Sequence, residues 1–229
     1  MLFRSEQLAG VPPLALITDR PRPPVQSFRG ARRSLLLAHP LSQTLHELAQ
    51  REEVTLYMLL LAAFQVLLAR RSGQEDIAVG SPVANRTQEQ VENLIGFFVN
   101  TLVLRTHVRA EETFRQVLRQ VKEVALGAYT HQDVPFEKLV EILHPERALN
   151  QEPLFQVMFV LQQPVYIQEA LPGLQVTALE QETSTAKFDL TLIVVEIEQG
   201  LRCVMEYNVD LFEMQTIDHF LGQWQTLLE

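Results

Sequence analysis

Apolar residues recur at helical spacing in several parts of the chain. The pattern is clearest between residues 114 and 128, where seven apolar positions, each one to four residues from the next, share one face of a helix. Residues 41–49 and 217–228 show the same kind of spacing. Residues 57–64 are apolar on every face, which predicts a helix buried between other layers of the protein. We therefore expect three amphipathic helices and one buried helix.

Five ranges carry the pattern of β-strands, and they are interspersed with the helices. Two of them are apolar on both faces, which is typical of central strands covered on two sides. The last two are separated by Gln199 and Gly200, which predicts a hairpin. Helices mixed with such strands favour an α/β fold with a mixed β-sheet flanked by helices. The strand ranges are 77–79, 99–108, 154–161, 188–197 and 201–207.

The first 33 residues differ from the rest of the chain. They hold five of the twelve prolines and show no sustained period, so we expect an extended lead-in or linker before a folded body at residues 34–229. Five arginines and no acidic residue lie between Arg20 and Arg33. Because no aromatic or strand platform accompanies them, we interpret them as solvated, mutually repelling charges of a linker rather than a nucleic-acid site.

Composition and charge narrow the functional classes. With 47% hydrophobic and 21% charged residues, the chain has a globular composition. Its net charge of −9 argues against a protein that binds nucleic acid mainly through charge. Cys203 is the single cysteine, which excludes a disulfide framework and fits a cytoplasmic location. The start lacks a signal-peptide pattern, and the longest apolar stretch, residues 54–69, is too short to cross a bilayer, so we expect no membrane association.

Common signatures of metal, nucleotide and hydrolase chemistry are absent from the sequence. The six histidines lie far apart and have no partner at the spacing of metal ligands, so we expect no metal site. Glycine-rich phosphate loops and the G-x-S-x-G elbow do not occur. A lone cysteine within a strand pattern is more typical of a packed thiol than of a nucleophile.

A first distinctive segment covers residues 95–105. Gly96 permits an unusual backbone turn, the two phenylalanines after it are expected to be buried, and Asn100 and Thr101 lie where a strand begins. In a functional interpretation, the amide of Asn100 and the hydroxyl of Thr101 hydrogen-bond an amide-rich ligand beside an apolar channel.

Two more segments follow. In residues 131–137, Pro135 suits a first helical position, and Asp133 and Glu137 favour the positive end of a helix dipole. A helix start therefore explains much of this segment, and a histidine before a helix is usually a hydrogen-bonded residue. Residues 147–155 read as a polar loop that enters a central strand.

Together and in this order, the three segments resemble the later core motifs of the condensation domains of nonribosomal peptide synthetases. Residues 95–105 match the family pattern IGxFVNTLxxR, residues 131–137 match HQDxPFE, and residues 147–155 are a weaker match to a motif that ends in PLF. Flanking stretches typical of the family extend the resemblance over nearly the whole chain; they are residues 18–23, 80–86, 186–190 and 206–212.

The resemblance implies a fold of two lobes similar to chloramphenicol acetyltransferase, with a tunnel between them. In this family, peptidyl carrier proteins dock at opposite mouths of the tunnel, each inserts its phosphopantetheine arm, and the acceptor amine attacks the donor thioester to form an amide. The catalytic signature HHxxxDG lies in the first lobe. None of the six histidines here is adjacent to another or followed by Asp four residues later. The chain therefore corresponds to the C-terminal lobe.

From the resemblance we expect no catalytic residue in this chain and no amide formation by the chain alone. Expected partners are carrier proteins, whose phosphopantetheine arms are substrates, the N-terminal lobe and neighbouring synthetase domains. The alternative is a non-catalytic module that binds carrier proteins or other domains. Candidate tunnel-side residues are Gly96, Asn100, Thr101, His131, Gln132 and Asp133. Candidate structural motif residues are Phe97, Phe98, Arg105, Pro135, Phe136, Glu137, Asn150 and Pro153.

Overall fold

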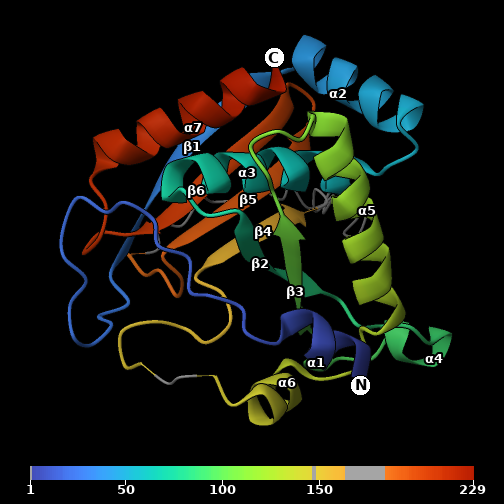
Figure 1. Ribbon diagram of the computed structural model, residues 1–229. Helices are drawn as coiled ribbons and strands as arrows, with labels where there is room; N and C mark the ends of the chain where they lie inside the picture. Colours follow the sequence, from blue (N-terminus) through green and yellow to red (C-terminus); the bar gives the residue numbers. More distant parts are fainter. Residues whose placement is uncertain (1, 146–147, 163–183) are drawn as a thin grey trace, which may run out of the picture.

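A mixed β-sheet forms the centre of the computed structural model, which describes residues 2–145, 148–162 and 184–229 (Figure 1). In these residues the sheet has six strands in the order β1-β6-β5-β4-β2-β3. β4 is parallel to both of its neighbours, and the other pairs are antiparallel. The predicted α/β fold is confirmed. The strands are β1 (Gly30–Ala38), β2 (Asp76–Val83), β3 (Asn100–His107), β4 (Val157–Gln162), β5 (Leu190–Ile197) and β6 (Gly200–Asn208).

Helices pack on both faces of the sheet, but unequally. Four long helices gather on one face, and two short helices lie near β3 on the other (Figure 1). The first group is α2 (His39–Arg51), α3 (Leu56–Ser72), α5 (Phe114–Thr130) and α7 (Met214–Leu228). The second group is α1 (Leu2–Leu8) and α6 (Phe136–Leu143), and α4 (Glu89–Glu92) lies in the connection between β2 and β3.

The main core is centred on α3, the helix that the sequence predicts to be buried. Its N-terminus is capped by the hydroxyl of Thr55, which accepts a hydrogen bond from the backbone N–H of Met58, and it ends at Gly73 in a left-handed conformation. Phe64 is fully buried between Phe159 and Phe220. The buried-helix prediction is therefore confirmed.

A second, smaller core lies on the opposite face of β2 and β3. Side chains alternate across a strand, so Ala78 and Val103 point away from the main core. They pack with Leu8 of α1, Leu139 of α6 and Phe155, which precedes β4. This second core brings the N-terminal helix and the segments after β3 and before β4 together.

The expectation of an extended lead-in is wrong for part of residues 1–33. Residues 2–8 form α1, and β1 begins at Gly30 and crosses the boundary placed at residue 34. A helix of seven residues is too short to show a helical period, and it is stabilised by burial of Leu8 in the second core.

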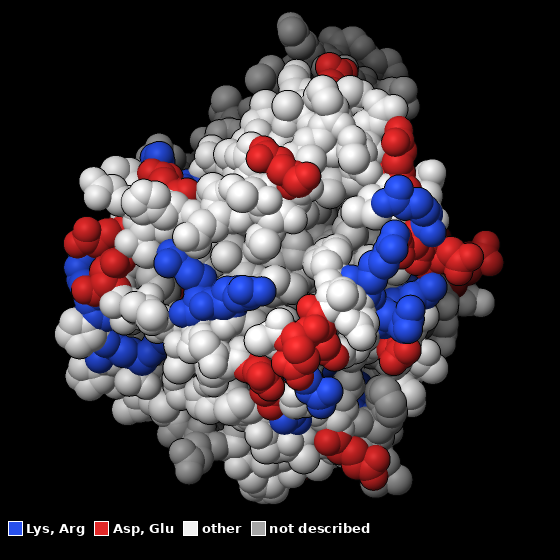
Figure 2. All heavy atoms as spheres, turned by 45° about the horizontal axis from the view of Figure 1, so that its top comes forward, with Lys and Arg blue, Asp and Glu red and all other residues white. Residues whose placement is uncertain are grey.

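The interpretation of the arginines as repelling linker charges is also wrong. Each one pairs with a carboxylate more than 160 residues away along the chain, which no local pattern could reveal. On the face seen in Figure 2, basic and acidic side chains lie beside one another at several places. The pairs are Arg20–Glu213, Arg22–Asp189, Arg29–Asp210, Arg32–Glu206 and Arg33–Asp218.

Strand boundaries differ from the predicted ones where tertiary pairing decides. β2 continues through Ser81 and Pro82, beyond the predicted strand at residues 77–79, because β3 pairs with it along its whole length. β4 begins only at Val157. The hairpin between β5 and β6 is confirmed.

In the described part of the chain, no single helix has the length and apolar character of a membrane span. Helices α2 and α3 have that length and character only when they are taken together, and the chain bends by 103° between them.

Candidate functional site

Asn100 joins the first motif segment to the second. It is the first residue of β3, and its side-chain Nδ2 donates to the carbonyl oxygens of Gln132 (2.6 Å) and Val134 (2.8 Å). Its Oδ1 accepts from the backbone N–H groups of Thr101 (2.8 Å) and Phe136 (3.1 Å). A primary amide has two donors and two acceptor lone pairs, so the Asn100 side chain is saturated.

This geometry corrects the ligand-binding interpretation of the Asn100 amide. The donors and acceptors that we expected to contact a ligand are bound to the chain's own backbone instead. The sequence could not show this, because three of the four partners lie 32 to 36 residues away. The strand start at Asn100 and Thr101 is confirmed.

The second motif segment runs from the end of α5 to the start of α6. His131 lies at the C-terminus of α5, where its Nδ1 is 2.9 Å from the carbonyl oxygen of Gly127. Pro135 is the extended residue before α6, so the predicted helix start is confirmed one residue later than expected. Asp133 and Glu137 are exposed, and Gln132 is half-buried.

The third segment is anchored by an aromatic cluster. The buried ring of Phe155 meets Phe136 edge-on at 5.6 Å and stacks on Phe188 at 5.1 Å. Gly80 of β2 lies directly beneath the Phe155 ring, and any Cβ at that position would overlap it. The three segments therefore meet at one end of the second core. Arg147, the first residue of the third segment, lies outside the described residues.

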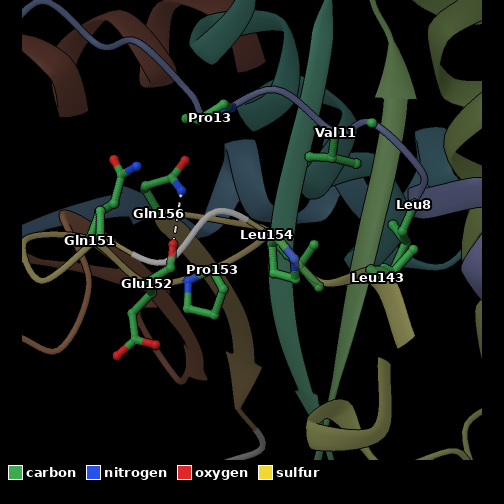
Figure 3. Close-up of a pocket in the computed structure, with 12 residues that line it drawn as sticks. Leu8, Val11, Pro13, Leu143, Gln151, Glu152, Pro153, Leu154 and Gln156 are labelled. Carbon is green, nitrogen blue, oxygen red and sulfur yellow. Dashed lines mark hydrogen bonds between the residues drawn. The ribbon is translucent and has the colours of Figure 1, made fainter. Parts of the chain in front are cut away.

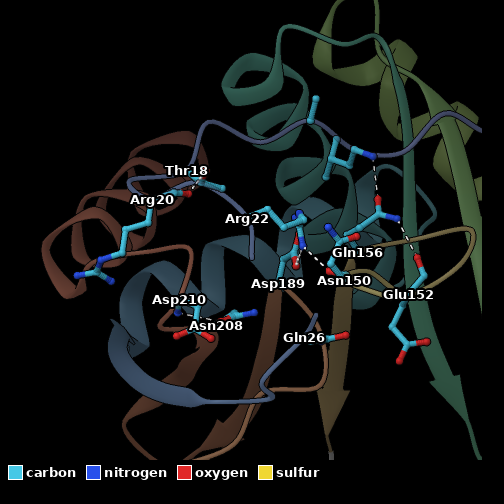
Figure 4. Close-up of polar contacts among 12 residues, drawn as sticks. Thr18, Arg20, Arg22, Gln26, Asn150, Glu152, Gln156, Asp189, Asn208 and Asp210 are labelled. Atoms are coloured by element: carbon cyan, nitrogen blue, oxygen red, sulfur yellow. Dashed lines mark hydrogen bonds and ion pairs between the residues drawn. The ribbon is translucent and has the colours of Figure 1, made fainter. Parts of the chain in front are cut away.

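Polar contacts fix the third segment to the N-terminal residues. Arg22 donates from Nη1 to Asp189 Oδ1 (2.9 Å) and to the carbonyl oxygen of Asn150 (3.1 Å), and its Nη2 contacts the second oxygen of Asp189 (Figure 4). The Oε1 of Gln156 accepts from the backbone N–H of Leu14 at 2.7 Å. The residues that we treated as a lead-in are therefore part of the folded body.

A cavity of about 340 Å³ lies between α1 and this third segment. Figure 3 shows Val11 and Leu154 on one side of it and Gln151 and Glu152 on the other. Pro153 also lines it. The cavity therefore has one apolar wall and one polar wall.

The connection between β2 and β3 exposes apolar side chains. Phe97 is 91% exposed, and Leu94, Ile95 and Val99 are exposed as well. The expectation that the aromatic residues of the first motif are buried is wrong for Phe97, because this loop projects beyond the sheet.

Phe98 and Gly96 also lie in the connection between β2 and β3. Phe98 is half-buried, with the guanidinium of Arg86 over its ring at 4.3 Å. Gly96 is exposed and has no positive φ, so the freedom of glycine to turn the backbone into the left-handed region is not used here. The first motif therefore divides into an exposed apolar part before β3 and an internally bonded part that begins at Asn100.

Two arginines reinforce the site. Arg105 of β3 makes a two-point ion pair with Asp76 (2.8 and 2.7 Å), and the hydrogen bonds to this carboxylate raise the pKa of Arg105. Arg4 of α1 is buried and donates to the carbonyl oxygens of Val134 and Thr101. Sequence reasoning missed Arg4, because a single arginine in an unpatterned segment gives no signal.

Two other kinds of site were considered, a reactive thiol and a metal site. Burial raises the pKa of the Cys203 thiol to about 12, so this cysteine is a protonated core residue at neutral pH. Within the described ranges, no three histidine, cysteine or carboxylate side chains come together as metal ligands.

Comparison with known proteins decides the family. The condensation-domain family model matches residues 3–229. The chain belongs to the condensation-domain family. One of the proteins that make up the linear gramicidin synthase of Brevibacillus parabrevis is 52% identical over 226 residues, which are 97% of this chain and 4% of that protein. The resemblance to condensation domains of nonribosomal peptide synthetases, and with it the chloramphenicol-acetyltransferase-like fold, is confirmed.

Two solved structures superpose on the chain over about half of their own length. The first condensation domain of the CDA synthetase has a TM-score of 0.78 and 23% identity, and the match covers 99% of this chain and 49% of that one. The X-domain in a complex with OxyB from teicoplanin biosynthesis has a TM-score of 0.88 and 26% identity, with coverage of 99% and 51%. The 229 residues thus span about half of these solved chains.

Proposed function

We propose that this chain forms the C-terminal lobe of an amide-forming condensation domain. In this proposal, it contributes one wall of the substrate tunnel and part of the carrier-docking surface, and a lobe outside these residues supplies the HHxxxDG histidines. One observation carries the proposal. The apolar side chains of Leu94, Ile95, Phe97 and Val99 project into solvent, and such groups are exposed together mainly where another surface covers them.

The chemistry assigned to the complete domain is an aminolysis. The acceptor amine attacks the thioester carbonyl of the donor, a C–N bond forms, the C–S bond breaks, and the thiol leaves with the proton given up by the amine. A histidine that removes that proton contributes about 10²–10⁴-fold to the rate as a general base. No HHxxxDG pattern occurs in these 229 residues, so in this proposal the other lobe supplies the histidine and this lobe positions the substrates.

We assign different tasks to the tunnel-side candidates. Asn100 and the backbone of Gln132 shape the lobe, because their hydrogen bonds are internal. Asp133 and Gly96 are exposed, and Thr101 is half-buried, so they are the candidates for contact with a phosphopantetheine arm. His131 is held through Nδ1 by Gly127 and positions the start of the segment. The arms and their carrier proteins are substrates and partners in this proposal.

A reconstitution experiment tests the proposal. The chain, an HHxxxDG-bearing lobe from a relative, and both together are each incubated with donor-loaded and acceptor-loaded carrier proteins, and amide product is measured by mass spectrometry. We expect product only from the two lobes together. Product from this chain alone, or equal product from the histidine lobe with and without this chain, would overturn the proposal. A Phe97→Ser variant serves as a matched test of the apolar contact.

The similarity to an X-domain in complex with OxyB favours a second candidate function. In this alternative, the chain binds another protein and performs no chemistry. Light scattering separates the two candidates, because a lobe with an uncovered apolar surface self-associates, whereas an independent binding module stays monomeric. A monomer that binds a carrier protein but fails in the reconstitution would support the alternative.

A further inference from the structure

Arg4 is a buried cation on a helix that lies outside all the motif segments. Its residue is 2% exposed, and its guanidinium reaches two separate segments of the chain. Nη1 donates to the carbonyl oxygen of Val134 at 2.7 Å, with that of His131 at 3.4 Å, and Nη2 donates to the carbonyl oxygen of Thr101 at 3.1 Å. Among the described residues, its partners are therefore backbone carbonyls rather than carboxylates.

Burial of the Arg4 guanidinium among carbonyl oxygens carries a cost in free energy. Removal of a guanidinium from water is unfavourable, and carbonyl oxygens offset the loss less fully than a carboxylate does. Burial accordingly lowers the pKa of Arg4. The planar fork of arginine holds the carbonyls of Val134 and Thr101 through two different nitrogens in fixed directions, which the single nitrogen of lysine does not reproduce.

The other end of α1 is fixed by a second arginine. Arg105 donates from Nη1 to the carbonyl oxygens of Gln7 (2.9 Å) and Ala9 (2.8 Å) while it holds Asp76 through its other two nitrogens. Helix α1 is thus bound near both ends to β3. Through Arg4, α1 also contacts the segment at residues 131–134.

We propose that Arg4 is a positioning residue that fixes the 131–134 segment against the start of β3 and couples helix α1 to it. Arg4 and Asn100 share the carbonyl oxygen of Val134 as an acceptor, so each supports the geometry of the other. The side chains of His131, Gln132 and Asp133 then project from a backbone held on two sides. The effect on amide formation rests on the proposed function, but the effect on the segment itself does not.

The first experiment measures amide hydrogen exchange on the chain itself. Arg4→Ala and Arg4→Lys are compared with Arg115→Ala, which removes an arginine that is largely exposed and paired with Glu52. We expect exchange of the Phe136 and Thr101 amides, which are bonded to Asn100, to rise about 10- to 100-fold in both Arg4 variants and to stay unchanged in Arg115→Ala. Millimolar methylguanidinium should restore slow exchange in Arg4→Ala and not in Arg4→Lys.

Equal exchange in the Arg4 variants and Arg115→Ala would overturn the proposal. If Arg4→Ala fails to fold by circular dichroism, Arg4→Lys decides, because it keeps the charge and the aliphatic stem. Unchanged exchange in a folded Arg4→Lys variant would equally overturn it.

The second experiment measures amide formation in the reconstituted two-lobe domain. We expect Arg4→Lys to lower kcat by about tenfold or more with little change in KM for the acceptor, because a misplaced segment misorients substrate. Absence of product with the wild-type chain would mean that the proposed function fails, while the exchange result would still stand. Full activity of Arg4→Lys alongside an active wild type would refute the positioning role.

Discussion

The buried ion pair between Arg22 and Asp189 makes a sharp test of how the N-terminal residues are held. The Asp189 side chain is 5% exposed and that of Arg22 is 24% exposed. Among the described residues, Arg22 is the side-chain partner of both carboxylate oxygens, and it also binds the carbonyl oxygen of Asn150. Arg22→Met keeps the length of the stem and removes all three contacts, which leaves Asp189 as a buried carboxylate without its cation.

The expected loss in the free energy of unfolding follows from the burial of the Arg22–Asp189 pair. Removal of one partner of a buried pair costs about 3–5 kcal/mol, because the remaining charge is left without compensation. Arg22 is about one quarter exposed, so water can reach part of the vacated space, and we expect the lower end, about 3 kcal/mol in the free energy of unfolding. Asp189→Asn should cost less, about 1–2 kcal/mol, because the freed guanidinium can turn toward water.

Urea denaturation monitored by circular dichroism is the assay, with Arg33→Met as the matched control. Arg33 pairs with Asp218, and both side chains are about 40% exposed, so loss of this pair should cost less than about 1 kcal/mol. The double variant Arg22→Met/Asp189→Asn should be less destabilised than the sum of the single variants. Equal losses from Arg22→Met and Arg33→Met, or strict additivity, would refute the reasoning.

Substitutions or modification at four other positions have expected outcomes as well. Gly80→Ala should lower the free energy of unfolding by about 1–3 kcal/mol in urea, since its methyl group meets the Phe155 ring, and an unchanged midpoint would contradict this. Asn100→Ala should cost about 3 kcal/mol in the same assay, because it leaves buried backbone groups unpaired. Burial raises the pKa of the Cys203 thiol from 9.0 to about 12, so Cys203 should resist thiol reagents at pH 8 until the chain unfolds. The free energy of unfolding should fall as the pH rises from 9.0 to about 12, since only the unfolded chain releases the thiol proton in that range. Phe97→Ser should change stability by less than about 0.5 kcal/mol but weaken binding to an HHxxxDG-bearing lobe in calorimetric titration.

The pattern of apolar residues predicted the structure correctly where one segment alone carries the signal. Residues 57–64 are apolar on every face, and residues 58–65 of the helix that contains them are all buried. The periodic stripe between residues 114 and 128 likewise lies within α5. In both cases the signal spans several turns, so tertiary contacts reinforce it rather than override it.

Sequence reasoning failed where a partner far along the chain decides. Helix α1 is stabilised by docking of Leu8 in the second core, and the arginines near it are neutralised by acids in the last quarter of the chain. The sequence predicts a ligand for the Asn100 side chain, because three of its four backbone partners lie more than 30 residues ahead and give no local signal. Recognition of a motif identifies which residues matter and leaves open whether they bind each other or a ligand.

The motif residues of this chain therefore fall into two groups, those whose side chains contact the chain itself and those whose side chains are exposed. Asn100, Arg105 and Phe136 are bound or packed within the chain, so we expect their substitution to reduce the proposed activity through the fold. Phe97 and Asp133 are exposed and contribute little to the core, so a loss of activity on their substitution would report a contact with another lobe, a carrier or a substrate arm. Paired measurements of stability and condensation on the two groups separate structural from contact roles, which activity alone would merge.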